Sequence, residues 1–402
     1  MHTFVLMKFP NKLKIKLTTR VEKEALRTLD APSNLIDFSS NDYLGFAKST
    51  GIFEATHQYL IDKKININGA TGSRLLSGNH SLYSEVETLI CDVHQSEAAL
   101  IFNSGYDANL GFFSSLPQRG DIILYDEFIH ASIRDGIQLS NAKAYKFKHN
   151  SLDDLETLLI RYSELVSESD TEIYVVTESV FSMDGDSPDL VRMSEIIHKH
   201  GAHFIVDEAH AIGVFGEHGC GEVQRMGLEK KVFARIITFG KALGCHGAAI
   251  LGSQELQNYL VNFARSFIYT TGLSPHALAT IQTVYNHLTV SSSLSSSLKI
   301  NSVENSQQKL QENIQFFKLE IQRLKLQHQF IKSNSAIHCC VISGAIKTKE
   351  IALKLQQKGF NVQAILSPTV REGKERLRFC LHSYNTKEEI TKVLNLLSTF
   401  VS

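Results

Sequence analysis

Short apolar runs with the character of buried strands alternate with helical segments between about residues 80 and 251. The apolar residues of segment 81–95 fall on one face at helical spacing. Strand-like runs lie at 98–102, 121–125, 142–147, 173–177, 203–207, 235–239 and 247–251. Such alternation is typical of a parallel sheet whose two faces are covered by helices. The sequence therefore predicts an α/β fold built on a mostly parallel sheet.

The pattern changes after about residue 290. A Ser-rich stretch, 291–302, precedes a helical segment that runs to about residue 327. The rest indicates a strand, a helix, two strands and a helix, in chain order, at 336–343, 348–358, 361–366, 376–382 and 386–399. These elements predict a compact α+β domain of about 110 residues. We expect three parts, which are an N-terminal segment, a large domain and a smaller C-terminal domain at 1–48, 49–290 and 291–402.

The N-terminus mixes basic and apolar residues without a continuous apolar core or a small-residue cleavage site. No signal peptide is therefore predicted. Lysines alternate with apolar residues over 12–17, as in an exposed strand or an amphipathic arm. No uninterrupted apolar stretch approaches the roughly 18 residues of a membrane span. The six cysteines lack C-x-x-C spacing, which favours a reducing compartment, and we expect a cytoplasmic protein.

Residues 207–210 read D-E-A-H, the Mg-ATP motif of one helicase class. That motif works beside a phosphate-binding loop that contains a Gly-Lys pair. Around Gly240-Lys241 such a loop would need Gly at 235 and Ser or Thr at 242, where this chain has Arg235 and Ala242. With 41 basic and 42 acidic residues, the chain also lacks the basic character of nucleic-acid motors. We expect neither helicase activity nor nucleic-acid binding.

Asp207, His210 and Lys241 suit a different chemistry. Lys241 follows a strand-like run and lies between two glycines in TFGKALG, which lets a planar ligand approach the backbone. A partly desolvated lysine can act as an amine nucleophile. The lysine that holds pyridoxal phosphate (PLP) needs an acid at the pyridinium nitrogen, a donor near the phenolate oxygen and a phosphate-binding turn. Asp207 suits the first role and His210 the second.

Two further segments complete this hypothesis. The turn 103–106 connects a strand to a helix, where free N–H groups can hold a phosphate, and His130 follows the strand-like run 121–125. Each residue alone has a structural explanation, because a strand-end Asp is often a helix cap and a single His is often a satisfied core residue. Their occurrence at successive strand ends favours a ligand site, since ligands of open α/β sheets bind there.

Nine motifs span nearly the whole chain in a constant order. They are FSSNDYLGFA (38–47), GATGSRLLSGNHSLYSEVE (69–87), FNSGYDANLG (102–111), DEFIHASIRDG (126–136), TESVFSMDGD (177–186), VDEAHAIGVFGEHGCG (206–221), TFGKALGCHGAA (238–249), IYTTGLSP (268–275) and SPTVREGKERLRF (367–379). Together they resemble the α-oxoamine synthases, fold-type I PLP enzymes that condense an amino acid with an acyl-CoA and release CoA and CO2. The resemblance implies PLP as cofactor and a homodimer with its site between two subunits.

The resemblance also implies roles for individual residues. Lys241 would be the Schiff-base lysine, Asp207 the partner of the pyridinium nitrogen and His130 the residue stacked on the ring. His210 and Ser182 would contact the phenolic oxygen. The implied phosphate ligands are Ser104, Gly105, Tyr106, Thr238, and the partner subunit's Thr270 and Thr271.

Two residues from opposite ends of the chain, Asn41 and Arg378, resemble the family's contacts to the substrate carboxylate. Arg376 lies on the same predicted strand as Arg378. We expect the two arginine side chains to point to opposite faces, with Arg378 in the pocket. The H-x-H-x-x-H pattern at 198–203 lacks the carboxylate or Cys that would complete a metal site, so we expect no metal.

Four activities share these motifs. They are 8-amino-7-oxononanoate synthase (L-alanine with pimeloyl-CoA, in biotin biosynthesis), 2-amino-3-ketobutyrate CoA ligase, 5-aminolevulinate synthase and serine palmitoyltransferase. The run 367–379 is most similar to the first, and we therefore expect L-alanine and pimeloyl-CoA as substrates. Arg371 stands where that run usually has proline, which adds a cation and removes a fixed φ near the acyl-CoA entrance.

The ligase and the palmitoyltransferase are the alternative activities. A catalytically silent subunit of a heteromeric relative is the non-enzymatic alternative. Such a subunit would be expected to lack the lysine, and this chain has Lys241 together with Asp207 and His210. The sequence therefore favours an active enzyme.

Overall fold

The computed structural model describes residues 9–22, 26–27, 29, 34–166, 170–289 and 303–401, which form two compact units, Met1–Leu35 and Ile36–Ser402. In the first unit, helix α1 (Asn11–Glu22) has no buried residue. The alternation over 12–17 had suggested a strand or an arm; the strand interpretation was wrong. The Ser-rich connection predicted at 291–302 lies outside the described residues.

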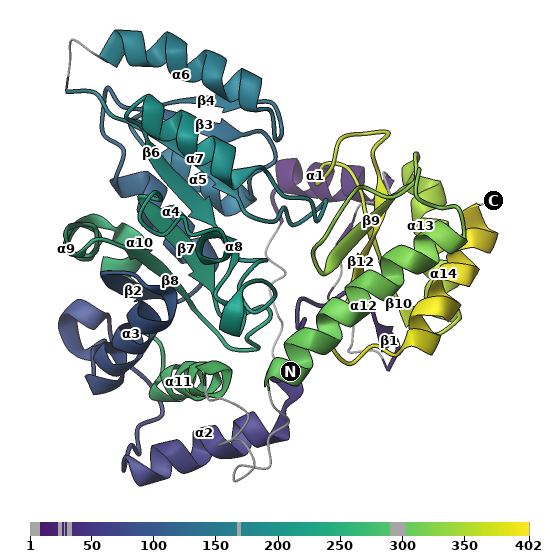
Figure 1. Cartoon of the computed structure of the whole chain (residues 1–402), viewed down its shortest axis with the longest axis horizontal. Helices are drawn as coiled ribbons and strands as arrows, with labels where there is room; N and C mark the ends of the chain where they lie inside the picture. The colour runs from purple at the N-terminus through teal and green to yellow at the C-terminus, as the bar shows by residue number, and fades with distance from the viewer. Residues whose placement is uncertain are drawn as a thin grey trace, which may run out of the picture. The chain divides into compact units, whose positions relative to one another are not determined.

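A seven-stranded sheet forms the core of the larger part of the second unit (Figure 1). Its spatial order is β2 (Ala98–Phe102), β8 (Ala248–Gly252), β7 (Ala234–Thr238), β6 (His203–Asp207), β5 (Ile173–Glu178), β3 (Ile122–Asp126) and β4 (Lys143–Phe147). The strands from β7 to β4 are parallel, and β8 is antiparallel to both of its neighbours. All seven predicted runs form strands, and the prediction of a mostly parallel sheet is confirmed.

Helices cover both faces of this sheet. The helices of this part of the chain are α2 (Thr50–Asp62), α3 (Ser81–His94), α4 (Gly105–Ser115), α5 (Ala131–Leu139), α6 (Leu152–Val166), α7 (Leu190–Lys199), α8 (Glu222–Arg225), α9 (Gln254–Phe263), α10 (Arg265–Ile268) and α11 (Pro275–Thr289), with short helices η1 (Phe46–Lys48), η2 (Arg74–Gly78) and η3 (Glu217–Gly219). Helix α7 ends before Gly201, which has the left-handed conformation (φ 65°) typical of a glycine that follows a helix.

Strand pleating explains how the two faces are filled. Ile205 and Ile236 pack with helices α4, α5 and α9, whereas the next residues along the strands, Val206 and Ile237, join clusters on the opposite face. Successive strand side chains point to opposite faces, so an apolar run can bury both. This is why the strands are continuous apolar runs rather than alternating ones.

The C-terminal part is built on a three-stranded antiparallel sheet. Its order is β11 (Gln363–Ile365), β12 (Arg376–Cys380) and β9 (Ile337–Val341), and β1 (Ile36–Asp37) pairs with β10 (Phe360–Asn361) in a separate parallel pair. The helices are α12 (Val303–Arg323), α13 (Ala345–Gln357) and α14 (Lys387–Val401). One apolar cluster contains residues of α3, α11 and these three helices. The domain boundaries at 48/49 and 290/291 stay a prediction.

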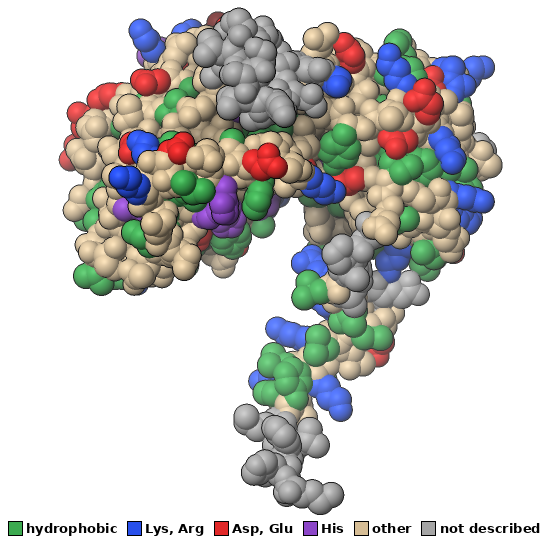
Figure 2. Space-filling view, turned by 90° about the horizontal axis from the view of Figure 1, so that it is seen from below, with side chains coloured by type: hydrophobic (Ala, Val, Ile, Leu, Met, Phe, Trp, Pro, Cys, Tyr) green, Lys and Arg blue, Asp and Glu red, His purple; other side chains and the backbone are tan. Residues whose placement is uncertain are grey.

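Two surface properties bear on the sequence-based expectations. Lys and Arg side chains are interspersed with Asp and Glu side chains over the face shown in Figure 2, in keeping with the net charge of −1. Among the described residues, no helix is long and apolar enough to cross a membrane.

Candidate active site

Acidic side chains end three neighbouring parallel strands of the central sheet. Asp126, Glu178 and Asp207 are the last residues of β3, β5 and β6, and all three are buried. Because the carboxyl ends of parallel strands meet at one edge, these residues lie along a single rim of the sheet. Thr238 ends β7 beside them. The predicted site is therefore on the rim where open α/β sheets bind ligands.

Lys241 and His210 meet at this rim. The Lys241 Nζ atom lies 2.9 Å from His210 Nε2. The turn that carries Lys241 depends on Gly244, whose φ is 62° and whose Cβ, if present, would lie 2.2 Å from the Ala47 nitrogen. Only glycine allows this close approach of two backbones. The N-terminal motif 38–47 thus packs directly on the lysine turn.

Burial changes the protonation of both residues. Burial lowers the pKa of Lys241 to about 8, against the opposing effect of the Asp207 charge. Burial, and then the positive charge of Lys241, lower the pKa of His210 well below its usual value. At neutral pH His210 is therefore uncharged, and a useful fraction of Lys241 is the free amine that a nucleophile or base requires.

Asp207 is held in place by an asparagine that sequence reasoning missed. Asn109, buried on helix α4, donates from Nδ2 to Asp207 Oδ2 at 2.9 Å and to Ser132 Oγ at 3.1 Å. The backbone N–H of Ala209 donates to Asp207 Oδ1 at 2.9 Å. The only sequence signal for Asn109 is a polar residue on the otherwise apolar buried face of a helix.

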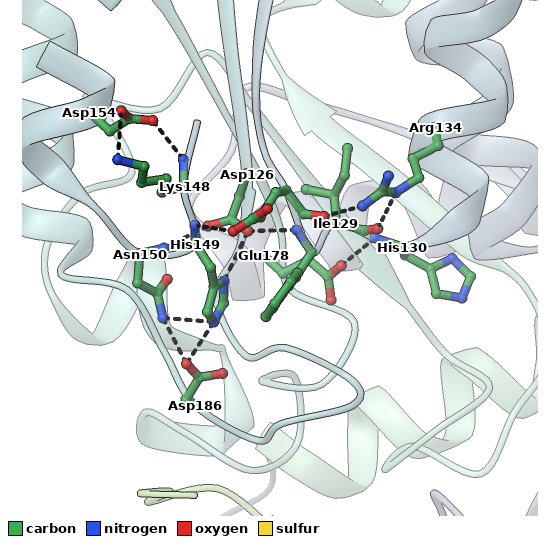
Figure 3. A network of polar contacts seen from close by, with 12 residues as sticks. Asp126, Ile129, His130, Arg134, Lys148, His149, Asn150, Asp154, Glu178 and Asp186 are labelled. Carbon is green, nitrogen blue, oxygen red and sulfur yellow. Dashed lines mark hydrogen bonds and ion pairs between the residues drawn. The ribbon is translucent and has the colours of Figure 1, made fainter. Parts of the chain in front are cut away.

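His130 joins the same network from the start of helix α5. Its Nδ1 lies 2.8 Å from Ser132 Oγ. Its backbone N–H donates to Glu178 Oε1 at 2.6 Å, as Figure 3 shows. Burial lowers the pKa of His130, and burial together with the Asp207 charge raises the pKa of Glu178 to about 8. Glu178 is a second residue that sequence reasoning missed, although it lies in the motif 177–186.

The predicted phosphate turn is the N-terminus of helix α4. Ser104 caps this helix, with its Oγ accepting from the Asp107 N–H at 3.0 Å. Gly105 faces Thr238, because a Cβ on Gly105 would lie 3.6 Å from Thr238 Oγ1. An 11-residue helix that starts with a glycine beside a threonine hydroxyl suits a phosphate group. Tyr106 is more exposed, and its hydroxyl bonds Asp135.

The chain's own Thr270 and Thr271 lie close to this turn. Asn103 Nδ2 donates to Thr270 Oγ1 at 3.0 Å and to the Thr271 carbonyl at 2.6 Å. Both threonines are therefore beside the residue that precedes Ser104. That the partner subunit's Thr270 and Thr271 bind the phosphate stays a prediction.

The two predicted carboxylate contacts meet despite their separation in sequence. Arg378 donates from Nη2 to Asn41 Oδ1 at 3.0 Å and from Nε to the Ser182 carbonyl at 2.7 Å. Arg376 contacts the Met183 carbonyl and forms an ion pair with Asp184. The expectation that the two arginines point to opposite faces was wrong, because strand residues two apart share a face.

A histidine between two carboxylates, His149, stabilises the segment 181–186, which contacts both arginines (Figure 3). His149 Nδ1 lies 2.9 Å from Asp126 Oδ1, and its Nε2 lies 2.8 Å from Asp186 Oδ2. Although burial disfavours the charged ring, the bonds to the two carboxylates raise the pKa of His149 to about 9. Asp186 also bonds Phe181 through its backbone. Sequence reasoning missed this cluster because His149 shows no distinctive spacing.

Glu208, the central residue of the D-E-A-H string, is structural. Its carboxylate forms a buried ion pair with Arg235 at 2.6 Å and accepts from the Val223 N–H at 3.0 Å. Arg235 is one of the two residues that replace the phosphate-loop signature, and it also bonds the carbonyls of His94 and Cys220. The D-E-A-H string therefore supplies two site residues, Asp207 and His210, and one member of a buried ion pair, Glu208.

Comparison with known proteins identifies the family. A profile of class I and II aminotransferases matches residues 33–397. The chain belongs to this family. An 8-amino-7-oxononanoate synthase of Emericella nidulans is 38% identical over 408 residues, which cover 97% of this chain and 95% of that protein.

Solved structures agree with this assignment. A serine palmitoyltransferase from S. paucimobilis with bound PLP–myriocin has a TM-score of 0.84 at 26% identity, covering 97% of this chain and 96% of that chain. An 8-amino-7-oxononanoate synthase from Francisella tularensis has a TM-score of 0.73 at 29% identity, covering 91% and 97%. The predicted fold-type I architecture and membership of the PLP-dependent α-oxoamine synthases are confirmed.

Proposed function

We propose that the chain is a PLP-dependent acyltransferase that condenses L-alanine with pimeloyl-CoA to give an aminoketone, CoA and CO2. The meeting of Lys241 and His210 beside Asp207 carries the PLP assignment. The choice of substrates is supported by relatives named 8-amino-7-oxononanoate synthase that align over most of this chain. The product would enter biotin biosynthesis.

The residues present fit PLP. When bound, PLP supplies an electron sink for the negative charge that develops on the α-carbon of the amino acid. Lys241 would hold it through its amine, Asp207 would pair with the ring nitrogen, His130 would stack on the ring, and His210 and Ser182 would face its phenolic oxygen. Its phosphate would lie at the N-terminus of helix α4, among Ser104, Gly105, Tyr106, Thr238, and the partner subunit's Thr270 and Thr271.

Each step needs a specific residue. Arg378 and Asn41 would bind the carboxylate of L-alanine, because a guanidinium and an amide supply donors in fixed directions. Once the amino group of L-alanine has replaced it on the cofactor, the freed Lys241 amine, whose pKa burial lowers to about 8, would remove the α-proton. The α-carbon then attacks the thioester carbonyl, the C–S bond breaks, and CoA leaves. Loss of CO2 and return of a proton complete the aminoketone.

Replacement of the lysine tests the chemistry. We expect Lys241→Ala to lose the visible absorbance of the lysine-bound cofactor and to lose turnover, while its melting temperature stays near that of the parent. Lys231→Ala, at an exposed position, is the matched control and should keep both. Undiminished absorbance or turnover in Lys241→Ala would overturn the assignment.

Release of CoA tests the substrates. Purified protein loaded with PLP is incubated with L-alanine plus pimeloyl-CoA, glycine plus acetyl-CoA, and L-serine plus palmitoyl-CoA. We expect turnover with the first pair; its absence would contradict the proposal. Serine palmitoyltransferase activity is the second candidate, because the TM-score to the S. paucimobilis enzyme exceeds that to the F. tularensis enzyme.

We further propose that the enzyme is a cytoplasmic homodimer. The family resemblance and the location of exposed apolar residues near the phosphate turn support a subunit contact there. Leu75 and Leu76 on η2, and Tyr269 beside Thr270, are such residues. Sedimentation of the PLP-loaded protein at micromolar concentration should give the mass of two chains, and a single-chain mass would contradict this.

A further inference from the structure

Tyr43 occupies the centre of a buried chain of polar contacts. Its side chain is fully buried, in the motif 38–47. The Tyr43 hydroxyl lies 2.7 Å from His210 Nδ1 and 3.1 Å from Asn41 Oδ1. His210 Nε2 contacts Lys241, and Asn41 Oδ1 contacts Arg378. One hydroxyl therefore connects the reactive lysine to the pair proposed to bind the substrate carboxylate.

When Lys241 is protonated, the available hydrogens determine which group donates in each of these hydrogen bonds. An ammonium only donates, so His210 Nε2 must accept from Lys241. A neutral imidazole then carries its proton on Nδ1, which donates to the Tyr43 oxygen. The Tyr43 hydrogen is left for Asn41 Oδ1, which accepts from Arg378 with its other lone pair. Burial raises the pKa of Tyr43 well above its usual value, so the hydroxyl stays neutral.

The same hydroxyl also suits the opposite arrangement. A histidine that faces an anionic oxygen must present Nε2–H, which leaves Nδ1 as an acceptor. Tyr43 can then rotate its hydrogen toward Nδ1, because a hydroxyl both donates and accepts. Asn41 Oδ1 keeps its bond from Arg378, so no buried acceptor is abandoned. A phenylalanine at position 43 would leave His210 Nδ1 without a hydrogen-bond partner in both arrangements.

We propose that Tyr43 is a positioning residue that lets His210 exchange between its two neutral tautomers, one accepting from the Lys241 ammonium and the other donating to the phenolic oxygen of PLP. This rests on the proposed function for the second tautomer only. The first tautomer is a property of the cofactor-free chain. Tyr43 would act through His210 and not by contact with the reacting atoms.

A second buried pair offers a matched control. The Tyr285 hydroxyl lies 2.7 Å from His94 Nε2, and both side chains are buried. Neither residue touches the groups placed in the site. Tyr43→Phe and Tyr285→Phe therefore each remove one buried hydroxyl from a Tyr–His contact, and only the first removes it from His210.

The test uses the full chain with ¹⁵N-labelled histidine. Two-bond ¹H–¹⁵N spectra of the cofactor-free protein report which His210 nitrogen carries the proton, with His210→Gln to assign the signals. We expect Nδ1–H in the parent and in Tyr285→Phe. In Tyr43→Phe we expect Nε2–H together with an uncharged Lys241, because a buried Nδ1–H without an acceptor costs more than removal of a proton from a lysine whose pKa is about 8. An unchanged tautomer in Tyr43→Phe would overturn the proposal, whatever the outcome of the substrate assays.

Cofactor affinity gives the second readout. Titration with PLP, followed by its absorbance, should show about tenfold weaker binding for Tyr43→Phe, the loss expected for one buried hydrogen bond. Tyr285→Phe should bind PLP as the parent does, although both variants melt at lower temperature. Equal weakening in the two variants would assign the effect to general loss of packing. If the parent itself does not bind PLP, the proposed function fails, and the tautomer measurement still stands.

Discussion

His210 and His149 lie on the same rim of one sheet and have opposite electrostatics. His210 meets a cation, Lys241, and a neutral hydroxyl, and its pKa is well below the usual value. His149 lies between the carboxylates of Asp126 and Asp186, and its pKa is raised to about 9. A catalytic group must be able to gain or lose a proton, whereas a charged group that stabilises the fold must be paired with opposite charges. We call Lys241, His210 and Asp207 the reactive cluster. We call His149, Asp126 and Asp186 the supporting cluster.

The largest effect is expected from the reactive cluster. Asp207→Asn removes the charge that would keep the cofactor ring protonated, and we expect kcat to fall by on the order of 10³-fold or more. The fold should survive, because the Asn109 amide, whose Oδ1 has no hydrogen-bond partner among the described residues, can flip to bond the new side chain. Steady-state assays and thermal unfolding check the two halves of this prediction. A variant with near-normal kcat would remove Asp207 from the mechanism.

Substitutions in the supporting cluster should reduce the stability of the fold more than they reduce activity. His149→Ala leaves Asp126 and Asp186 without their buried cation, and we expect the free energy of unfolding to fall by about 3 to 5 kcal/mol. Denaturant unfolding measures this loss. The control is His203→Ala, which breaks a half-exposed pair with Glu172 and should cost less than about 1 kcal/mol. Equal losses in both variants would contradict a special role for His149.

The pH dependence of stability should also separate the two histidines. The folded pKa of His149 lies above the usual 6.5, so its contribution is complete below about pH 6.5 and disappears as the pH rises through about 9. We expect the parent to lose at most about 3 kcal/mol more than His149→Gln between these limits. The lowered pKa of His210 acts oppositely, because its contribution is present above pH 6.5 and is lost as the pH falls. Parallel curves for parent and His149→Gln would show that His149 is not charged in the folded protein.

The smallest effect is expected at Arg371, which stands where the related run usually has proline. Arg371 pairs with Glu127 at 2.5 Å and lies 5.8 Å from the centre of the Phe128 ring, but its side chain is 67% exposed. An exposed ion pair contributes little, so we expect Arg371→Pro to change the free energy of unfolding by less than about 1 kcal/mol. A large rise in KM for the acyl-CoA alone would instead show that this residue contributes to binding that substrate.

Much of the rim was predictable from local sequence. Asp207 ends, and His130 follows, an apolar run whose length and composition already indicate a strand, and carboxyl ends of parallel strands meet on one edge. Thr238 was implied only by the family resemblance. Asn109, Glu178, His149 and Tyr43 were not predicted as site residues. Each owes its importance to a partner far away in the chain, and periodicity carries no information about such partners.

The two arginines of β12 also show that local sequence does not predict contacts between residues far apart in the chain. The alternation of side chains along a strand was sufficient to predict that Arg376 and Arg378 share a face, and applying it wrongly led to the opposite expectation. No such rule could predict that Arg378 would reach Asn41 or that Arg376 would pair with Asp184. These contacts depend on how the C-terminal sheet packs against the N-terminal motif 38–47 and the segment 181–186.

The sequence by itself determined the strands, the helices that separate them and the family, because these depend on local periodicity and on motifs that keep their order. Only the tertiary structure decided which residues are charged, and which tautomers and hydrogen-bond directions are possible. The physical reason is that burial and the distance to a charge set protonation, and both arise when strand ends meet the N-terminal motif and the C-terminal sheet. Lys241 and His149 are both basic residues in the sequence, and only their surroundings give one a lowered pKa and the other a raised one.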